Sequence, residues 1–470
     1  MTDTSAHFDL IVIGSGPGGY TAAIRAAQLK MKVAIVERDK LGGICLNWGC
    51  IPTKALLKNA EIFELFHKGD EWGISADSVR FDFSKVVKKS RNAANRLNKG
   101  VEFLLKKNGI ATYFGTARLS GKGQVQILDP EQRLQDTLTA DRILLATGAR
   151  PRTLPGVDFD GQKVIWSTEA MVLPNPPKSM VVIGAGAIGV EFAYFYNAFG
   201  TEITLVEMMP QILPVEDKEI ADLLAKSLRK RRIKIMTDTK VSSLVKTDSG
   251  VEVTVESAQG QKSQLNAEKA LMCIGVRGNH EGLGLEQFGV RLNKDFIRVD
   301  GDYQTNVTGL YAIGDVIGSP LLAHVASAEG ISAVEGMAGL EERLKVNYDN
   351  IPGCTYCQPQ VASLGLTEEQ ARQKGYTLKI GRFPFRANGK AIALGETEGL
   401  VKLIFDASYG ELLGAHILGV EATEMIAELA IAKGLEATYQ EILHTVHPHP
   451  TLTEAVMEAA ADAYGESINQ

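Results

Sequence analysis

The sequence predicts an α/β fold with two Rossmann-like domains, the second inserted in the first, followed by a separate α+β domain. Three observations lead to this prediction. Residues 10–19 and 180–189 repeat one glycine-rich pattern, 170 residues apart. A strand-like stretch that ends in Gly-Asp, residues 310–315, follows the second copy. Beyond about residue 345 the chain changes to strands with alternating apolar residues and two helical stretches.

Each copy of the repeat predicts a βαβ unit. A short apolar strand is followed by a glycine turn, an Ala-rich helix and a second apolar strand that ends in a glutamate. In such a unit the first glycine permits a tight turn, the second lets a pyrophosphate approach the backbone, and the third lets the helix pack on the strand. The phosphates then lie at a helix N-terminus, and the glutamate accepts the ribose hydroxyls. The candidate residues are Gly14, Gly16, Gly19 and Glu37 in the first copy, and Gly184, Gly186, Gly189 and Glu207 in the second.

Two dinucleotide sites in one chain suggest FAD at one and NAD at the other. Asp315, at the end of a later strand, could hydrogen-bond the ribityl chain of FAD, which assigns FAD to the first copy. The last domain carries no nucleotide motif, so its apolar faces are expected to meet a second copy in a homodimer. The expected segments are 1–150 and 277–345 for the FAD-binding domain, 151–276 for the inserted NAD-binding domain, and 346–470 for the C-terminal α+β dimerisation domain.

Charge and composition narrow the classes of partner. The chain has 470 residues, and its net charge of −6 gives no electrostatic reason to bind nucleic acid. The one basic run, residues 229–232, is expected to be a solvated helix end. No apolar stretch approaches the roughly 20 residues that span a bilayer, and no secretory signal is present, so we expect a cytoplasmic protein. Five cysteines in so long a chain cannot be a stabilising disulfide framework.

Cys45 and Cys50 form a closely spaced cysteine pair, which suggests either a redox-active disulfide or a metal site. Five residues of regular helix rise about 7.5 Å, more than the roughly 4.4–6.8 Å between the Cα atoms of bridged cysteines. The segment must therefore depart from a helix to form a disulfide, and Asn47 and Gly49 suit such a departure. Metal binding is the alternative, but neither a second cysteine pair nor a histidine lies nearby in the chain to complete a metal site. A redox-active disulfide is the favoured interpretation, and no metal is expected.

These motifs together carry a family resemblance. Residues 42–54, both glycine turns, the Gly-Asp pair at 314–315 and residues 449–454 resemble those of the pyridine nucleotide-disulfide oxidoreductases, and among these the dihydrolipoamide dehydrogenases. The resemblance covers essentially the whole chain. It implies that Cys45 is the interchange thiol that faces the substrate and that Cys50 is the thiol against the flavin.

The resemblance also implies further site residues. Lys54 is expected near the flavin, with Glu191 as its partner. Additional cofactor contacts that the resemblance implies are Gly115, Thr147, Gly148, Leu322, Ala323 and His324 for FAD, and Val241 and Gly275 for NAD.

His449 resembles the acid/base of the family, oriented by Glu454. A free thiol titrates near about 8.5, so a base that removes the proton from a substrate thiol raises the population of the nucleophilic thiolate. From the residues alone, the favoured interpretation of the segment is a His-Pro turn that leads into a helix, with Thr451 or Thr453 as the cap. His447 lies two residues earlier, but the family motif points to the histidine directly before the proline.

The implied activity is the oxidation of protein-bound dihydrolipoamide with NAD⁺, in a 2-oxo-acid dehydrogenase or glycine-cleavage system. A glutathione-reductase-like enzyme that uses NADPH is the nearest alternative. Glu207 argues against it because a carboxylate repels a 2′-phosphate, and residues 208–213 contain no arginine. Mercuric reductase is disfavoured because residues 465–470 contain no vicinal cysteines. A chain that acts mainly as a docking subunit for lipoyl-bearing proteins is a further alternative.

Several residues depart from the family pattern. Trp48 takes the place of a small aliphatic residue beside the cysteine pair, and Thr53 replaces a serine. Cys354 and Cys357 form a C-x-x-C sequence in the last domain, where they are expected to be core or interface thiols. Cys273 is expected to be a small buried residue.

Overall fold

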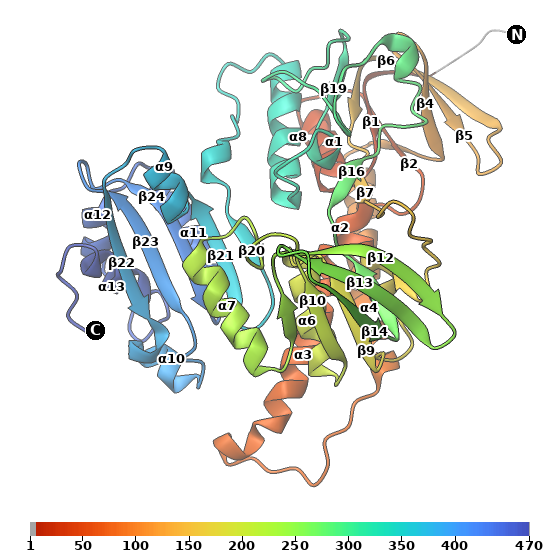
Figure 1. Ribbon diagram of the computed structural model, residues 1–470. Coiled ribbons are helices and arrows are strands. Elements are labelled where there is room, and N and C mark those ends of the chain that lie inside the picture. Colours follow the sequence, from red (N-terminus) through yellow and green to blue (C-terminus); the bar gives the residue numbers. More distant parts are fainter. Residues whose placement is uncertain (1–5, 470) are drawn as a thin grey trace, which may run out of the picture. The chain divides into compact units, whose positions relative to one another are not determined.

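The computed structural model describes residues 6–469, which form two compact units (Figure 1). We call them unit 1 and unit 2. Unit 1 contains the chain up to Leu56, Ser84–Arg152 and Gly275–Val346, and unit 2 contains Leu57–Phe83, Thr153–Ile274 and the chain from Asn347 onward. The four-segment division expected from the sequence is finer than these two units and stays a prediction.

A parallel sheet forms the centre of unit 1. Its strand order is β3-β2-β1-β6, with β19 also parallel to β6, while β5 and β4 extend the sheet in the antiparallel sense. The last four residues of β1, positions 10–13, are all buried, as expected for a parallel strand covered on both faces. The strands are β1 (Ala6–Ile13), β2 (Val33–Glu37), β3 (Ala111–Phe114), β4 (Thr116–Gly121), β5 (Gln124–Leu128), β6 (Leu134–Leu145) and β19 (Leu310–Ala312).

Two helices of unit 1 pack closely because glycines line their contact. A Cβ atom on Gly18 would lie 2.9 Å from the carbonyl oxygen of Ala326, and one on Gly330 would lie 2.7 Å from that of Gly18. The backbones of α1 and α8 therefore touch close to the N-terminal end of α1. The helices of this unit are α1 (Pro17–Gln28), α2 (Gly43–Trp48), α3 (Cys50–His67, which continues into unit 2), α4 (Phe83–Lys107) and α8 (Ala323–Met337).

Unit 2 contains a second parallel sheet of five strands, in the order β11-β10-β9-β15-β8. α6 follows β9, and its side chains from Val190 to Tyr196 are all buried. A three-stranded antiparallel sheet accompanies it. The strands are β8 (Val164–Ile165), β9 (Ser179–Ile183), β10 (Glu202–Val206), β11 (Lys234–Met236), β12 (Thr239–Thr247), β13 (Gly250–Ser257), β14 (Lys262–Ala267) and β15 (Lys269–Met272), and the helices are α5 (Ser167–Ala170), α6 (Ala187–Ala198) and α7 (Lys218–Lys230).

The C-terminal part of unit 2 is an antiparallel sheet with helices packed on it. A Cβ on Gly381 would lie only 1.7 Å from the carbonyl oxygen of Ala459, so the last helix rests directly on the sheet. The strand order is β20-β21-β24-β23-β22. The elements are β20 (Gly353–Thr355), β21 (Gln360–Gly365), β22 (Leu378–Pro384), β23 (Leu400–Asp406), β24 (Leu412–Gly419), α9 (Glu368–Gln373), α10 (Gly389–Ala393), α11 (Ala422–Gly434), α12 (Tyr439–His444) and α13 (Glu454–Asp462). The predicted fold class is confirmed, with two Rossmann-like sheets and a terminal α+β domain.

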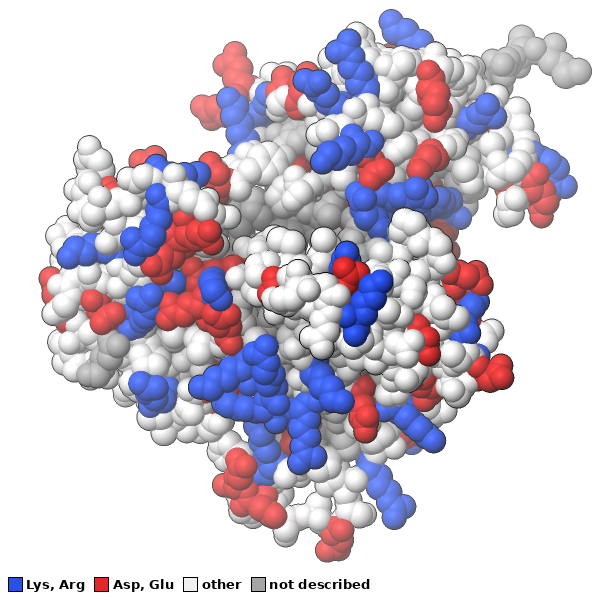
Figure 2. Space-filling model, in the orientation of Figure 1, with Lys and Arg blue, Asp and Glu red and all other residues white. Residues whose placement is uncertain are grey.

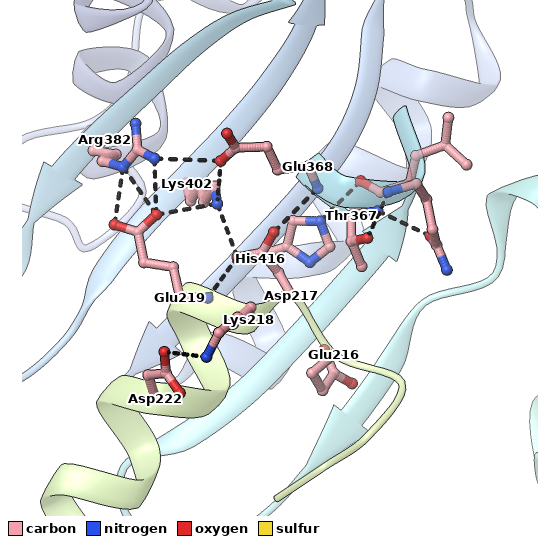
Figure 3. Close-up of polar contacts among 12 residues, drawn as sticks. Glu216, Asp217, Lys218, Glu219, Asp222, Thr367, Glu368, Arg382, Lys402 and His416 are labelled. Atoms are coloured by element: carbon pink, nitrogen blue, oxygen red, sulfur yellow. Dashed lines mark hydrogen bonds and ion pairs between the residues drawn. The ribbon is translucent and has the colours of Figure 1, made fainter. Parts of the chain in front are cut away.

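A buried charge cluster joins α7 to the C-terminal sheet within unit 2 (Figure 3). The side chain of Lys402 on β23 is 2% exposed, and its Nζ lies 2.8 Å from Asp217, 3.0 Å from Glu219 and 2.9 Å from Glu368. Arg382 on β22 adds a second cation, 2.9 Å from Glu219. Because an unpaired buried charge is costly, all members of this cluster depend on one another.

The surface of the described residues carries charges of both signs. On the face drawn in Figure 2, basic side chains gather at the lower centre and acidic side chains gather above and to the left of them, while charges of both signs are scattered over the rest. Residues 229–232 lie at and just after the end of α7, as predicted for the basic run. Among residues 6–469, no helix combines the length and the apolar character needed to cross a membrane.

Candidate functional site

The first glycine turn has the geometry of a phosphate-binding loop. Gly14 has φ +100°, and a Cβ there would lie 2.3 Å from the carbonyl oxygen of Ala146. A Cβ on Gly19 would lie 2.0 Å from the oxygen of Gly14, so the helix is packed against the turn. Gly16 faces open space, with no atom within 4 Å of its would-be Cβ. The three glycines therefore have the functions expected in a dinucleotide-binding fold. Gly14 allows the tight turn, Gly16 leaves room for a ligand, and Gly19 allows the helix to pack closely against the turn.

The second glycine turn repeats this geometry in unit 2. Gly184 has φ +99°, and its Cβ would lie 2.3 Å from the oxygen of Cys273. The Cβ of Gly189 would lie 1.9 Å from the oxygen of Gly184, and Gly186 again faces open space. The residues present thus fit a second pyrophosphate at the N-terminus of α6.

The two glutamates are held at their strand ends by backbone N–H groups. Glu37 Oε2 accepts hydrogen bonds from the backbone N and the Oγ of Ser15, at 2.9 and 2.6 Å, and Oε1 accepts one from the backbone of Asp39. Glu207 accepts from the backbone of Ala185 and of Met209, at 2.7 and 2.9 Å. A carboxylate has about four acceptor positions, so both glutamates keep capacity for ribose hydroxyls.

The expected FAD contacts lie along the edge of the unit 1 sheet. The backbone N of Gly115 donates to the carbonyl oxygen of Glu37 at 2.9 Å. Asp315 follows β19 in a short 3₁₀ turn, where burial raises the pKa of its carboxyl. The remaining expected contacts at this edge are Thr147 and Gly148 after β6, and Leu322, Ala323 and His324 at the N-terminal end of α8.

Asn279 also lies near these expected contacts, although no sequence motif marks it. Its side-chain nitrogen donates to the carbonyl oxygen of Thr147 at 2.9 Å, and Thr147 Oγ1 donates to the carbonyl oxygen of Asn279 at 2.7 Å. This reciprocal pair fixes the turn after β6. The partners are 132 residues apart and share no motif, so only the fold reveals the contact.

Of the two further residues expected to contact NAD, only Val241 lies in the same unit as the second glycine turn. The backbone N of Thr239, at the start of β12, donates to the carbonyl oxygen of Glu207 at 2.9 Å. Val241 lies two residues further along the same strand. Gly275 has φ +94° and belongs to unit 1, and its role at the second turn stays a prediction.

The cysteine segment is attached directly to the first glycine turn. The backbone N of Gly42 donates to the carbonyl oxygen of Ser15 at 3.0 Å. A Cβ on Gly43 would lie 2.7 Å from the Cα of Gly16. The segment that carries Cys45 therefore starts against the open position of the turn, where a bound dinucleotide would lie.

The two cysteines lie on separate helices, as their spacing requires. α2 ends at Trp48, Gly49 adopts a non-helical conformation with φ −145° and ψ −117°, and α3 begins at Cys50. Both cysteines are thiols, and a hydrogen bond joins their side chains. That bond and burial raise the pKa of the Cys45 thiol, while the charge of Lys54 acts to lower it.

Lys54 and Glu191 belong to different units, and their pairing stays a prediction. Lys54 lies on α3, one turn after Cys50. Glu191 is buried on α6, and its Oε1 accepts a hydrogen bond from the backbone N of Tyr356 at 2.9 Å. The contact with Tyr356 had no signal in the sequence, because it joins segments 165 residues apart.

The two C-terminal histidines differ in their ring contacts. His447 is held between two acceptors, the carbonyl oxygen of Thr445 at 2.9 Å and Glu428 at 2.8 Å, so both of its ring nitrogens must donate. The bond to Glu428 raises the pKa of His447. His449 Nδ1 donates to Glu454 at 2.8 Å, and Nε2 has no partner among residues 6–469. Only His449 therefore has a ring nitrogen placed to accept a proton.

The remaining cysteines are structural. Cys357 is fully buried, and its thiol donates to the carbonyl oxygen of Pro359 at 3.1 Å. Cys354 packs against the core of the C-terminal sheet, as expected for a core thiol. Cys273 is partly exposed rather than buried as expected, and desolvation raises the pKa of its thiol to about 12.

Comparison with known proteins agrees with this geometry. Residues 8–330 match the family model described as pyridine nucleotide-disulphide oxidoreductase, and residues 351–460 match the dimerisation domain of the same family. Dihydrolipoyl dehydrogenases of Rhizobium etli and Zymomonas mobilis are each 49% identical to the chain, over 98% of its length and 99% of theirs. Among solved structures, LpdA from Mycobacterium tuberculosis has a TM-score of 0.89 and 26% identity, covering 97% of this chain and 99% of its own. A Cu(II) complex of the HOCl-induced flavoprotein disulfide reductase RclA from Escherichia coli has a TM-score of 0.86 and 26% identity, with the same coverage. The glycine turns, the cysteine pair and these matches have one common explanation, which is that the chain belongs to the pyridine nucleotide-disulphide oxidoreductase family.

Proposed function

We propose that this protein is a dihydrolipoyl dehydrogenase, which oxidises protein-bound dihydrolipoamide and reduces NAD⁺. The observation that carries the proposal is the hydrogen-bonded thiol pair of Cys45 and Cys50, on a segment that starts against Gly16 of a dinucleotide turn. The printed name of the curated relatives, dihydrolipoyl dehydrogenase, supports the same substrate. FAD fits the first glycine turn and NAD the second, because Gly16 and Gly186 leave open space at helix N-termini.

The proposed reaction transfers two electrons from the substrate dithiol to the Cys45–Cys50 disulfide. A substrate thiolate attacks Cys45 Sγ of the Cys45–Cys50 disulfide, the S–S bond breaks, and Cys50 leaves as a thiolate. The second substrate thiol then displaces Cys45, which closes the substrate disulfide and leaves both protein cysteines reduced. FAD, when bound, supplies the redox chemistry that carries the electron pair onward to NAD⁺.

His449 is the proposed base for the substrate thiols. Its Nε2 accepts the proton, while Glu454 holds Nδ1 as the donor and so fixes the ring tautomer. The Oε2 atom of Glu454 accepts from the backbone N of Thr451 at 2.8 Å, which fixes the carboxylate itself. Burial alone would raise the pKa of Glu454, but the hydrogen bonds from Thr451 and His449 lower it, so the group stays charged near neutral pH.

The protein forms a homodimer through its dimerisation domain, residues 351–460. We propose that each active site is shared, with the cysteines of one subunit and His449 and Glu454 of the other. The side chain of His449 is 77% exposed in the single chain, as suits a base that serves a neighbouring subunit.

NAD⁺ is the proposed coenzyme in preference to NADP⁺. Glu207 is fixed by the backbone of Ala185 and Met209, so its charge would meet a 2′-phosphate directly. The residues that follow, 208–213, offer no arginine to neutralise such a phosphate.

Lipoyl-bearing proteins are the proposed partners, either an acyltransferase of a 2-oxo-acid dehydrogenase or a glycine-cleavage carrier protein. Stoichiometric co-purification with one of them identifies the system that the protein serves. The cytoplasm is the proposed compartment, since five cysteines in a chain of 470 residues are too few for a stabilising disulfide framework.

A coupled assay tests the proposed function. Wild-type protein, loaded with FAD, should reduce NAD⁺ with dihydrolipoamide, and Cys45→Ser and Cys50→Ser should each abolish this activity. Cys354→Ala, a cysteine outside the pair, is the matched control and should retain it. Activity with NADPH and glutathione disulfide, together with none on dihydrolipoamide, would instead support the glutathione-reductase-like alternative.

A further inference from the structure

Trp48 lies between the two cysteines in the chain, and two cations lie close to its ring. The Cζ of Arg91 lies 4.5 Å from its ring centroid, and the Nζ of Lys40 lies 5.4 Å from it. A cation within about 6 Å of an indole face is attracted by the ring quadrupole. Trp48 is half-buried, whereas Lys40 is exposed. The Arg91 contact is therefore the closer and better shielded of the two.

Arg91 makes a second contact with the same segment. Its Nη2 donates to the carbonyl oxygen of Asn47, in the last turn of α2. Such a carbonyl has no partner within the helix, so the guanidinium satisfies it while its plane covers the neighbouring indole. Nη1 of Arg91 is buried and has no hydrogen-bond partner among the described residues.

The helix that carries Arg91 fastens α2 at a second point. Asn98 lies two turns further along α4, and its Nδ2 donates to the carbonyl oxygen of Leu41 at 2.6 Å. Asn47 donates to the same carbonyl and to that of Gly43, both at 2.9 Å. α4 therefore holds the residues just before α2 through Asn98 and the end of α2 through Arg91.

We propose that Arg91 is a positioning residue for the redox pair: through Trp48 and the Asn47 carbonyl, it holds α2 so that Cys45 lies opposite Cys50. This inference rests on the proposed redox role of the two cysteines. Arg91 reaches neither sulfur by any contact that the structure shows, and it acts by fixing the helix that carries Cys45. Trp48, the departure from the small residue usual in the family, is the surface on which Arg91 rests.

The consequence is a high effective concentration of one thiol toward the other. In a glutathione buffer, Cys45–SH and Cys50–SH react with glutathione disulfide to give the Cys45–Cys50 disulfide and two glutathione thiols. Holding the thiols in contact favours the disulfide, because the closing step is intramolecular. If α2 is released, this equilibrium constant must fall.

The test measures this equilibrium constant in the FAD-loaded dimer. Each variant is equilibrated in glutathione buffers, quenched with acid, alkylated, and scored by mass for the Cys45–Cys50 peptide. The variants are Arg91→Met, Arg91→Lys, Trp48→Val and the double variant Arg91→Met with Trp48→Val. Lys40→Met is the matched control because it removes the other cation from the same ring. Melting temperatures are recorded for all variants.

Arg91→Met should lower the equilibrium constant for disulfide formation by about three- to tenfold, the range of a partly desolvated cation–π contact. Arg91→Lys should not rescue it, since an ammonium cannot donate to the carbonyl and cover the ring together. Trp48→Val should have a similar effect, the double variant should add little to either single one, and Lys40→Met should remain within twofold of wild type.

Two results would overturn the proposal. One is an unchanged equilibrium constant in Arg91→Met, or in Arg91→Lys if the methionine variant does not fold, even with a lowered melting temperature. The other is full additivity of Arg91→Met and Trp48→Val, which would mean that they act separately. A wild-type protein that forms no Cys45–Cys50 disulfide in any buffer would contradict the proposed function itself and this inference with it.

Discussion

The Nδ1 atom of His449 lies 2.8 Å from the Oε1 atom of Glu454, five residues later at the start of α13. Glu454 is the first residue of α13, so the start of this helix also fixes the position of the His449 imidazole. His447, two residues before, is turned to a different carboxylate, Glu428. Neighbouring histidines in one short segment thus have separate partners, and their functions can be tested separately.

Glu454→Gln should lower kcat/KM for dihydrolipoamide by about 10- to 100-fold, because the neutral amide no longer stabilises a protonated imidazole. Steady-state rates of NAD⁺ reduction measure the effect. Glu428→Gln, at the partner of His447, is the control and should stay near wild type. Equal losses in the two variants would assign the effect to the stability of the segment rather than to the base.

Heterodimers test whether the active site is shared between subunits. Cys50→Ser and His449→Ala homodimers should each be nearly inactive in dihydrolipoamide oxidation. In a heterodimer with a shared site, one site has both cysteines and His449 intact, so up to half of the wild-type activity per dimer should return. Purified heterodimers as inactive as their parents, or a fully active monomer, would overturn the shared arrangement.

Gly16→Ala should fold normally and lose FAD. Its backbone, with φ −63°, suits alanine, and no protein atom lies within 4 Å of the new Cβ, so the methyl group occupies only the space left for the pyrophosphate. We expect flavin affinity to fall by at least about tenfold, measured as the flavin absorbance that remains after gel filtration.

Gly186→Ala is the matched control for Gly16→Ala, because its backbone and surroundings are the same in the second turn. It should stay yellow and show a raised KM for NAD⁺. A colourless Gly186→Ala protein and a yellow Gly16→Ala protein would reverse the assignment of the two cofactors.

Glu207 should set the preference between coenzymes. Glu207→Ala combined with Met208→Arg should raise kcat/KM for NADP⁺ relative to NAD⁺ by about tenfold or more, since a repulsive carboxylate is exchanged for a guanidinium beside the ribose. The wild type should strongly prefer NAD⁺. Equal kcat/KM values for the two coenzymes in the wild type would show that Glu207 does not discriminate.

Glu216 should make stability fall as the pH rises toward neutral. Burial raises its pKa to about 7, a hydrogen bond from Ser363 lowers it in part, and its Oε2 has no partner among residues 6–469. A carboxyl with a raised pKa binds more protons folded than unfolded, so stability is lost between about pH 4.5 and 7, by up to roughly 3 kcal/mol.

Glu216→Gln should therefore gain in melting temperature over the wild type as the pH is raised from 5 to 8. Glu202→Gln, at an exposed position of β10, is the control and should follow the wild type. Parallel curves for Glu216→Gln and wild type across this range would mean that Glu216 is not a buried acid in solution.

Local geometry explains how much of the site the sequence could predict. The turns at Gly14 and Gly184 were predictable from sequence because only glycine adopts a positive φ easily and leaves out the Cβ that would clash there. The break at Gly49 followed from the spacing of the cysteines. Strands and helices in the last domain were expected from its apolar residues, but nearly every residue of β23 and β24 is buried, so the alternation expected there is absent from their burial.

Contacts between distant segments were not predictable in the same way. Arg91 and Trp48 lie on helices joined only by the fold, and nothing in a run of charged residues on α4 marks one arginine as the partner of an indole. Likewise, the reciprocal bonds of Thr147 and Asn279 need both segments in place before either residue has a role. Pairing of this kind is a property of tertiary structure rather than of local pattern.

The position of Trp48 also gives the protein a built-in optical reporter. The chain has three tryptophans, of which Trp72 is half-exposed and Trp166 is stacked on Phe159 with ring centroids 3.6 Å apart. With Trp72 and Trp166 changed to phenylalanine, all indole emission would come from a ring in the redox segment itself. Opening and closing of the sulfur–sulfur bond could then be followed by fluorescence in real time, without a label and without a coupled assay.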